Sequence, residues 1–296
     1  MSSWITFTIL AAFMQAIRTA GQKQLTNCVS PMSSTLIRYV FGLPFAIVYL
    51  IYLTDGQTQS LLLEASKNTR FLIYGAMAGI AQIAATFLLI KVFSFRNFTV
   101  GTSFAKTEAI QAAVLGSVLF ASTLTPLAWL AVAIGFIGVF IVSIPTRAQS
   151  WEAQNVMLGT LSGTAFALTS LWLREASLSL NLPVLQSAAI TLVCMVGFQA
   201  LVCIGYTALR EPNQLAAIRT RLGLATFVGL TSALGSIGWF TAMTFQNPAI
   251  VKSLGQIEFI FTLLLTTLFF KERVSGRELL GVVAIVASVI LLLQSG

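Results

Sequence analysis

Two glutamates occupy matching places inside long apolar stretches of the sequence. Glu108 and Glu258 lie 150 residues apart, and each is the eleventh residue of its run, 98–120 and 248–270. If these runs cross a membrane, both carboxylates fall near the middle of the bilayer, where an ionisable group costs roughly 3 kcal/mol or more. Such groups usually belong to a transport path, a proton relay or a buried ion pair. Glu108 and Glu258 are therefore the first candidates for chemistry in this chain.

Two interpretations of the glutamate pair are open. A carboxylate beside another carboxylate, or in a dry pocket, favours its neutral form and can exchange protons, so the pair could bind a substrate or couple protons. Alternatively, Lys106, Lys252 or Arg18 neutralise the carboxylates in a static network that locks the helices together. As equivalent residues of two repeats, the glutamates should be related by a pseudo-twofold axis in either case.

Further polar residues interrupt the apolar runs and are candidates for the same path. Besides the two glutamates, the predicted substrate-binding or proton-coupling residues are Gln15, Arg18, Gln82, Lys106, Trp239, Lys252 and Gln256. At helical spacing Gln15 and Arg18 share one face, as do Lys252 and Gln256. The competing explanations are that Arg18 extends its side chain to the interface, and that Trp239 packs against lipid or neighbouring helices instead of offering a ring face to a cation.

The charges of these candidates do not cancel. With Arg38, which lies seven residues into its run, they comprise four cations and two anions. A site that uses all of them would prefer a substrate with negative charge, such as a carboxylate-bearing metabolite or a zwitterionic amino acid.

The composition excludes whole classes of protein. Hydrophobic residues make up 57% of the 296 residues and charged ones 9%, whereas soluble domains have about 25% charged residues. The net charge is +8, and most of the basic residues lie in short loops between apolar runs, which is typical of membrane topology and not of nucleic-acid binding. With no histidine, no Cys-x-x-Cys and no GxxxxGK[ST] loop, we expect no enzyme, no catalytic residues, no metal site and no cofactor.

Ten apolar runs are long enough to cross a bilayer core of about 30 Å. They span residues 4–21, 32–53, 70–90, 98–120, 126–145, 156–174, 183–208, 222–244, 248–270 and 276–294. The sequence thus predicts an all-α membrane protein of two five-helix repeats, 1–147 and 150–296. Because five crossings invert the second copy, the repeats should have opposite orientation around a central cavity.

The stretch from Leu268 to Gly281, which reads LFFKERVSGRELLG, resembles the glutamate-containing loop and glycine helix of EamA-type transporters in the drug/metabolite transporter superfamily. The length, ten runs and duplication agree with that family. In the first repeat Ser122 replaces the glutamate of the loop, and Ala109 and Phe259 follow the two glutamates where relatives often have a proline. The resemblance implies a cavity lined by spans 1, 3, 4, 6, 8 and 9 and a polar metabolite as substrate, frequently exported.

Two signals for the orientation of the chain conflict. The odd-numbered connections hold Lys23, Lys91, Arg96, Arg147, Arg210, Arg219, Arg221, Lys271, Arg273 and Arg277, whereas the even-numbered ones hold only Lys67, Arg70 and Arg174. The positive-inside rule then places both termini outside the cytoplasm. The family resemblance instead implies cytoplasmic termini.

The leading hypothesis is a multi-pass secondary carrier of the cell (inner) membrane that works by alternating access. It moves a small polar metabolite, an amino acid or organic anion, as an exporter, with membrane lipid around it and protons as a candidate coupling ion. The alternative is a flippase, or flippase subunit, for a lipid-linked substrate, with Arg219, Arg221, Lys271 and Arg273 as a headgroup pocket. The sequence predicts no nucleic-acid partner and leaves the oligomeric state open.

Overall fold

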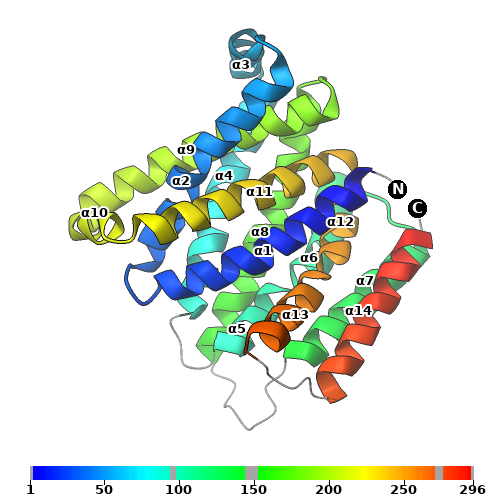
Figure 1. The fold of residues 1–296 in the computed structure, drawn as a ribbon. Coiled ribbons are helices and arrows are strands. Elements are labelled where there is room, and N and C mark those ends of the chain that lie inside the picture. The colour runs from blue at the N-terminus through cyan, green and yellow to red at the C-terminus, as the bar shows by residue number, and fades with distance from the viewer. Residues whose placement is uncertain (1–2, 94–97, 144–152, 271–275, 295–296) are drawn as a thin grey trace.

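Helices occupy all ten predicted apolar runs in the computed structural model, which describes residues 3–93, 98–143, 153–270 and 276–294 (Figure 1). The helices are α1 (Ser3–Leu25), α2 (Pro31–Thr54), α3 (Thr58–Lys67), α4 (Thr69–Phe93), α5 (Phe98–Ala105), α6 (Glu108–Phe120), α7 (Pro126–Ser143), α8 (Ala153–Ser179), α9 (Val184–Arg210), α10 (Pro212–Arg219), α11 (Leu222–Phe245), α12 (Pro248–Gly255), α13 (Glu258–Phe270) and α14 (Gly276–Gln294). These described residues contain no β-strand. Helices suit a chain in lipid because they satisfy their own backbone hydrogen bonds.

Polar residues and prolines between the apolar runs mark the helix ends. Ser30 caps α2 by accepting a hydrogen bond from the Ser33 amide, and Pro31 follows as the first helical residue. Asn247 caps α12 in the same way, with Pro248 next. Proline is tolerated at this position because its missing N–H would have no partner within the helix. The short helices α3 and α10 lie in two of the connections between runs.

Six helices are long and apolar enough to cross a membrane, judged by length and composition over the described residues: α2, α4, α8, α9, α11 and α14. The other predicted spans either are shorter, as α7 is, or contain the polar groups of interest, as α1 does, or are broken into two segments. The count of ten spans therefore stays a prediction.

The two broken helices are interrupted at equivalent places. The first breaks between α5 and α6 at Lys106 and Thr107, and the second between α12 and α13 at Gln256 and Ile257. Around both breaks the amides bond to carbonyls three residues back, as in the bond from Thr107 to Phe104 and that from Ile257 to Leu254. The chain thus tightens into a 3₁₀-like turn. Neither break contains a proline, so the interruption does not need the residue that relatives often have there.

Close packing supports both breaks from outside. A Cβ at Gly163 of α8 would lie 2.9 Å from the carbonyl oxygen of Ala105 and 3.1 Å from Oγ1 of Thr107. At the second break the Trp239 ring lies against Gly255 in the same manner. Only glycine allows these approaches, and burial within protein is the condition under which irregular backbone is tolerated in a membrane.

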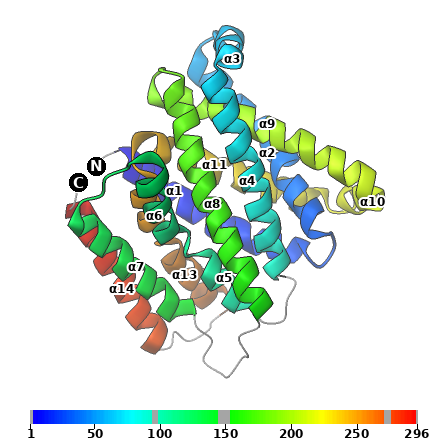
Figure 2. The same cartoon turned by 180° about the vertical axis from the view of Figure 1, so that it is seen from behind.

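The helix pairs with the most extensive contact join the first half of the chain to the second. The helix α4 packs against α8, α1 against α11, α2 against α9, and α7 against α14 (Figures 1 and 2). If α1 corresponds to α8 and α4 to α11, the first two pairings exchange under a twofold rotation. Figure 1 shows α10 on the left, opposite the two chain ends on the right.

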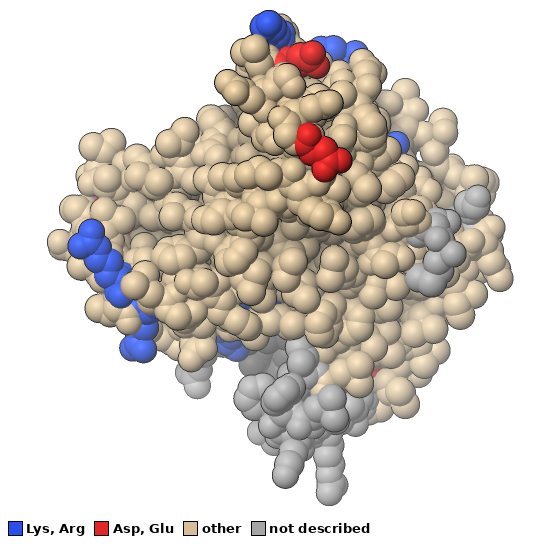
Figure 3. Space-filling model, turned by 45° about the horizontal axis from the view of Figure 1, so that its top comes forward, with Lys and Arg blue, Asp and Glu red and all other residues tan. Residues whose placement is uncertain are grey.

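The face of the molecule seen in Figure 3 is largely uncharged, with most of its charged side chains near its top and left edge. Large apolar side chains such as Val48, Tyr52, Val118 and Leu209 are exposed on the surface of the molecule. An apolar patch of this extent needs lipid or protein to cover it.

Arg174 lies elsewhere than the sequence predicted. It was counted with the even-numbered connections, but it lies inside α8 and is half-buried. Its Nη1 donates to the carbonyl oxygens of Met243 and Gln246, both at 2.6 Å, at the end of α11. A cation that stabilises the last carbonyls of a helix is a structural group, so Arg174 does not belong in a count of loop charges.

We expect Gly163→Val to lower the free energy of unfolding by about 1–3 kcal/mol, since the new side chain overpacks the contact with the first break. The thermal unfolding midpoint of the detergent-purified protein measures this. Gly205→Val in α9 is the matched control, because nothing lies within 4 Å of a Cβ there. Equal midpoints for the two variants would contradict the close packing.

Candidate functional site

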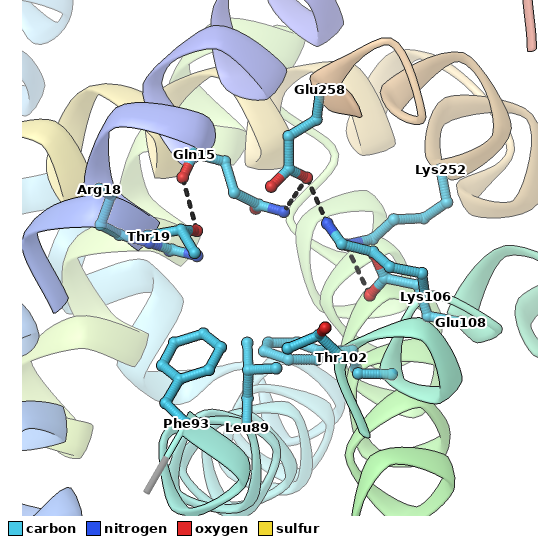
Figure 4. Close-up of a pocket in the computed structure, with 12 residues that line it drawn as sticks. Gln15, Arg18, Thr19, Leu89, Phe93, Thr102, Lys106, Glu108, Lys252 and Glu258 are labelled. Atoms are coloured by element: carbon cyan, nitrogen blue, oxygen red, sulfur yellow. Dashed lines mark hydrogen bonds and ion pairs between the residues drawn. The ribbon is translucent and has the colours of Figure 1, made fainter. Parts of the chain in front are cut away.

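Six of the nine predicted site residues meet in a central cavity of about 70 Å³ (Figure 4). Its walls come from α1, α4, α5, α6, α8, α12 and α13 and from the first break. The lining residues are Gln15, Arg18, Thr19, Leu89, Phe93, Thr102, Ala105, Lys106, Glu108, Phe166, Lys252 and Glu258. Segments more than 200 residues apart in sequence thus converge on one polar space inside an apolar bundle.

Two ion pairs cross between the halves of the chain. Nζ of Lys106 binds Oε2 of Glu258, and Nζ of Lys252 donates to Oε2 of Glu108 at 3.2 Å (Figure 4). Each half thus supplies the cation that neutralises the glutamate of the other. The Lys252 pair is the more enclosed, with a side-chain exposure of 7% for the lysine against 21% for Lys106.

The helix breaks position the two carboxylates. Glu108 is the first residue of α6 and Glu258 the first residue of α13. The positive end of the helix dipole stabilises an ionised carboxylate at this place. Each break therefore brings a carboxylate, a helix N-terminus and a lysine from the other half to one point.

A hydrogen-bonded chain extends from the Glu258 pair to α11. Nε2 of Gln15 donates to Oε2 of Glu258 at 2.7 Å, and Nε1 of Trp239 donates to Oε1 of Gln15 at 2.9 Å. The Trp239 ring centroid in turn lies 4.4 Å from Nζ of Lys252, within cation–π range. Trp239 thereby links the two ion pairs, and it is buried among protein groups.

Arg18 lies beside these pairs without joining them. Its side chain is only 5% exposed, and its Nε has no hydrogen-bond partner among the described residues. Arg18 also lines a second, smaller cavity of about 30 Å³, together with Arg38, Gln82, Ser236 and Trp239. The Arg18 side chain is thus enclosed by protein groups.

Comparison with known proteins agrees with this architecture. The sequence matches the EamA-like transporter family over residues 2–144 and again over 154–294. The chain belongs to the EamA-like transporter family. It is thus a membrane transporter of the drug/metabolite type with a two-repeat architecture, and members of this family are transporters and not enzymes.

Structural relatives of this EamA-like transporter share its fold. Among 25 matching chains of solved structures, one described only as the crystal structure of a protein has a TM-score of 0.75 at 15% identity. That match covers 99% of this chain and 97% of the other. A search of curated proteins gives no significant match.

Gln256 is the one predicted site residue of this transporter that lines neither cavity. Its side-chain amide lies against Gly135 of α7 and Ser288 of α14. In a continuous helix Gln256 would share a face with Lys252, but the chain leaves α12 at this residue, so the two side chains diverge. The other eight predicted residues line one or both cavities.

Several lining residues of the EamA-like transporter were not predicted. Phe166 lines both cavities, with its ring centroid 5.7 Å from Nζ of Lys252, but a phenylalanine in an apolar run gives no signal. Gln199 lies behind the cavity lining and donates to Oε1 of the lining residue Gln82 at 2.8 Å. As an amide within an apolar run, Gln199 could have been found by the same criterion as Gln82.

We expect Lys252→Met to destabilise the transporter by about 3–5 kcal/mol, because it leaves Glu108 as an uncompensated buried charge. The double variant Lys252→Met/Glu108→Gln should recover most of that loss, since neither charge remains. Thermal unfolding of purified protein measures both, with Lys67→Met on the exposed end of α3 as the control. A double variant no more stable than the single one would argue against the pair.

Proposed function

We propose that this chain is a ten-span secondary carrier in which two inverted repeats alternate access to the central cavity. Its cargo is a small polar metabolite, an amino acid or organic anion, which it exports across the cell membrane. The observation that supports this most directly is the crossing of both ion pairs between the halves at the two helix breaks. The pairs line the cavity and also join the parts that must move.

The crossed pairs offer a physical basis for coupling between cargo and movement. Rotation of one half against the other separates each lysine from its glutamate, which is costly in a medium of low dielectric constant. An anionic group of the cargo can replace a glutamate as the partner of Lys106 or Lys252. Binding then lowers the cost of movement, and an empty carrier stays in place.

In this proposal the cavity is accessible from the side of the odd-numbered connections. Thr19, Leu89 and Thr102 lie toward the ends of α1 and α4 and the start of α5, on the side of the odd-numbered connections. On the opposite side, Nδ2 of Asn247 donates to Oγ of Ser122 at 2.5 Å, which ties the two halves together. These contacts support a state that is closed on the even side.

We further propose that the odd-numbered connections face the cytoplasm. The sequence has ten basic residues in or beside the odd-numbered connections and three in or beside the even-numbered ones, of which Arg174 is half-buried in α8. The count is a property of the sequence, although Arg96, Arg147, Lys271 and Arg273 lie outside the described residues. The flippase alternative gains no support, because two of its four basic residues are among these and the other two, Arg219 and Arg221, are exposed.

A reporter fused after Gly296 tests the orientation. We expect a reporter that is active only outside the cytoplasm, such as a secreted phosphatase, to be active in this fusion. A cytoplasm-specific fluorescent reporter at the same place should be dark. The reverse pattern would assign the odd-numbered connections to the outside.

Replacement of Glu258 with glutamine should abolish transport in proteoliposomes and leave the protein folded. The amide keeps the shape of the side chain but removes the charge that binds Lys106. Glu64→Gln on the exposed surface of α3 is the matched control. Radiolabelled solute uptake against a preset gradient measures the rate, and a wild-type rate in Glu258→Gln would refute the role assigned to this carboxylate.

A further inference from the structure

Arg18 and Arg38 are buried cations that form no ion pair among the described residues. Each is 5% exposed, and neither forms an ion pair with any carboxylate of the residues that the structure describes. Nη1 of Arg38 donates to Oγ1 of Thr86 at 2.8 Å, while Nε of Arg18 has no partner in the described part of the chain. The two lysines, by contrast, are each matched by a glutamate. Two positive charges are thus left over in the interior.

Both arginines line the second cavity, and its other polar groups can support an anion. Gln82 lines the cavity and uses its amide oxygen to accept from Gln199, which leaves its amide nitrogen as the group that can donate to an anion. The Ser236 hydroxyl and the Trp239 ring complete this end of the wall. The guanidinium groups themselves present donors in a planar fork that matches carboxylate and phosphate oxygens.

The charge balance specifies what the cavity should hold. An unpaired charge in a low-dielectric interior is strongly unfavourable, and a bound ligand of opposite charge removes the penalty. We propose that Arg18 and Arg38 bind a small ligand with two negative charges, a dicarboxylate or a phosphate ester. That this dianion is the cargo rests on the proposed function.

A zwitterionic amino acid fits these surroundings less well. Its ammonium group needs a carboxylate, but no carboxylate is among the described residues that line the cavity around Arg38, since Glu108 and Glu258 line only the central cavity. Near Arg38 the cavity offers only cations, hydroxyls, amides and rings. The inference therefore narrows the cargo from polar metabolites in general to dianions.

The test compares ligands of similar size and different charge on the purified full-length protein. Succinate and inorganic phosphate supply the two kinds of dianion, butyrate is the matched monoanion and γ-aminobutyrate the matched zwitterion, all at constant ionic strength. Since a ligand raises the thermal midpoint by mass action, we expect succinate or phosphate to raise it and the other two not to. Which dianion binds more tightly separates a dicarboxylate site from a phosphate site.

Variants of the arginines test the assignment of the site. Arg18→Gln and Arg38→Gln should each weaken dianion binding by about tenfold or more, because each removes charge-assisted hydrogen bonds. Arg210→Gln, on the exposed end of α9, should bind as the wild type does. Without ligand, Arg18→Gln should unfold at a higher temperature, since an uncompensated buried charge is gone. If the glutamine variants do not fold, Arg18→Lys should keep selectivity for dianions with weaker binding.

The inference is overturned if neither dianion stabilises the protein, if γ-aminobutyrate binds as tightly as succinate, or if the glutamine variants bind like the wild type. Transport assays on the same preparation keep the two proposals apart. A protein that transports another solute and ignores dianions contradicts this site alone. A protein that binds dianions through Arg18 and Arg38 but transports nothing contradicts the carrier function and leaves the site in place.

Discussion

Charge inside an apolar bundle is the constraint on which this structure depends. Lipid and packed side chains cannot solvate an ammonium or a carboxylate, so each must find a partner within the protein. In this chain the partners come from opposite halves: Lys106 pairs with Glu258, and Lys252 pairs with Glu108. In each half, the glutamate is neutralised by the lysine of the other half. The central contact between the repeats is therefore both their attachment and the place where a charged ligand can compete.

The helix breaks follow from the same demand. A carboxylate in the middle of a continuous helix is surrounded by satisfied backbone groups, whereas one at a helix N-terminus also gains the dipole and free amides. The turns before Glu108 and Glu258 create such N-termini inside the bundle, where both carboxylates are buried. The interruption needs shielding from lipid, which the close approach at Gly163 and the Trp239 ring on Gly255 supply. Packing by the other helices thus takes the place of a kinking proline.

The sequence predicted the site's members better than their arrangement. Polar residues are easy to recognise within apolar runs, so residue type and position alone were enough to predict Glu108, Glu258, Arg18 and Gln15. The choice between a free glutamate pair and a neutralised one was left open, because it depends on contacts between residues about 150 positions apart. Gln256 shows the limit from the other side. Helical spacing placed Gln256 on the same face as Lys252. Because the helix breaks at Gln256, its side chain instead lies against Gly135, and no residue type in the sequence indicates that break.

The departure from perfect symmetry between the repeats bears on how a carrier of this design would work. The position equivalent to Lys252 is Thr102, and that equivalent to Lys106 is Gln256, so the two ion pairs cannot exchange roles under the twofold rotation. The Lys106 pair is more exposed and the Lys252 pair more enclosed. Water weakens an exposed pair more than an enclosed one. Separation of the Lys106 pair therefore costs less, and Lys106 shares the central cavity with Arg18, so an anion bound there can contact both cations.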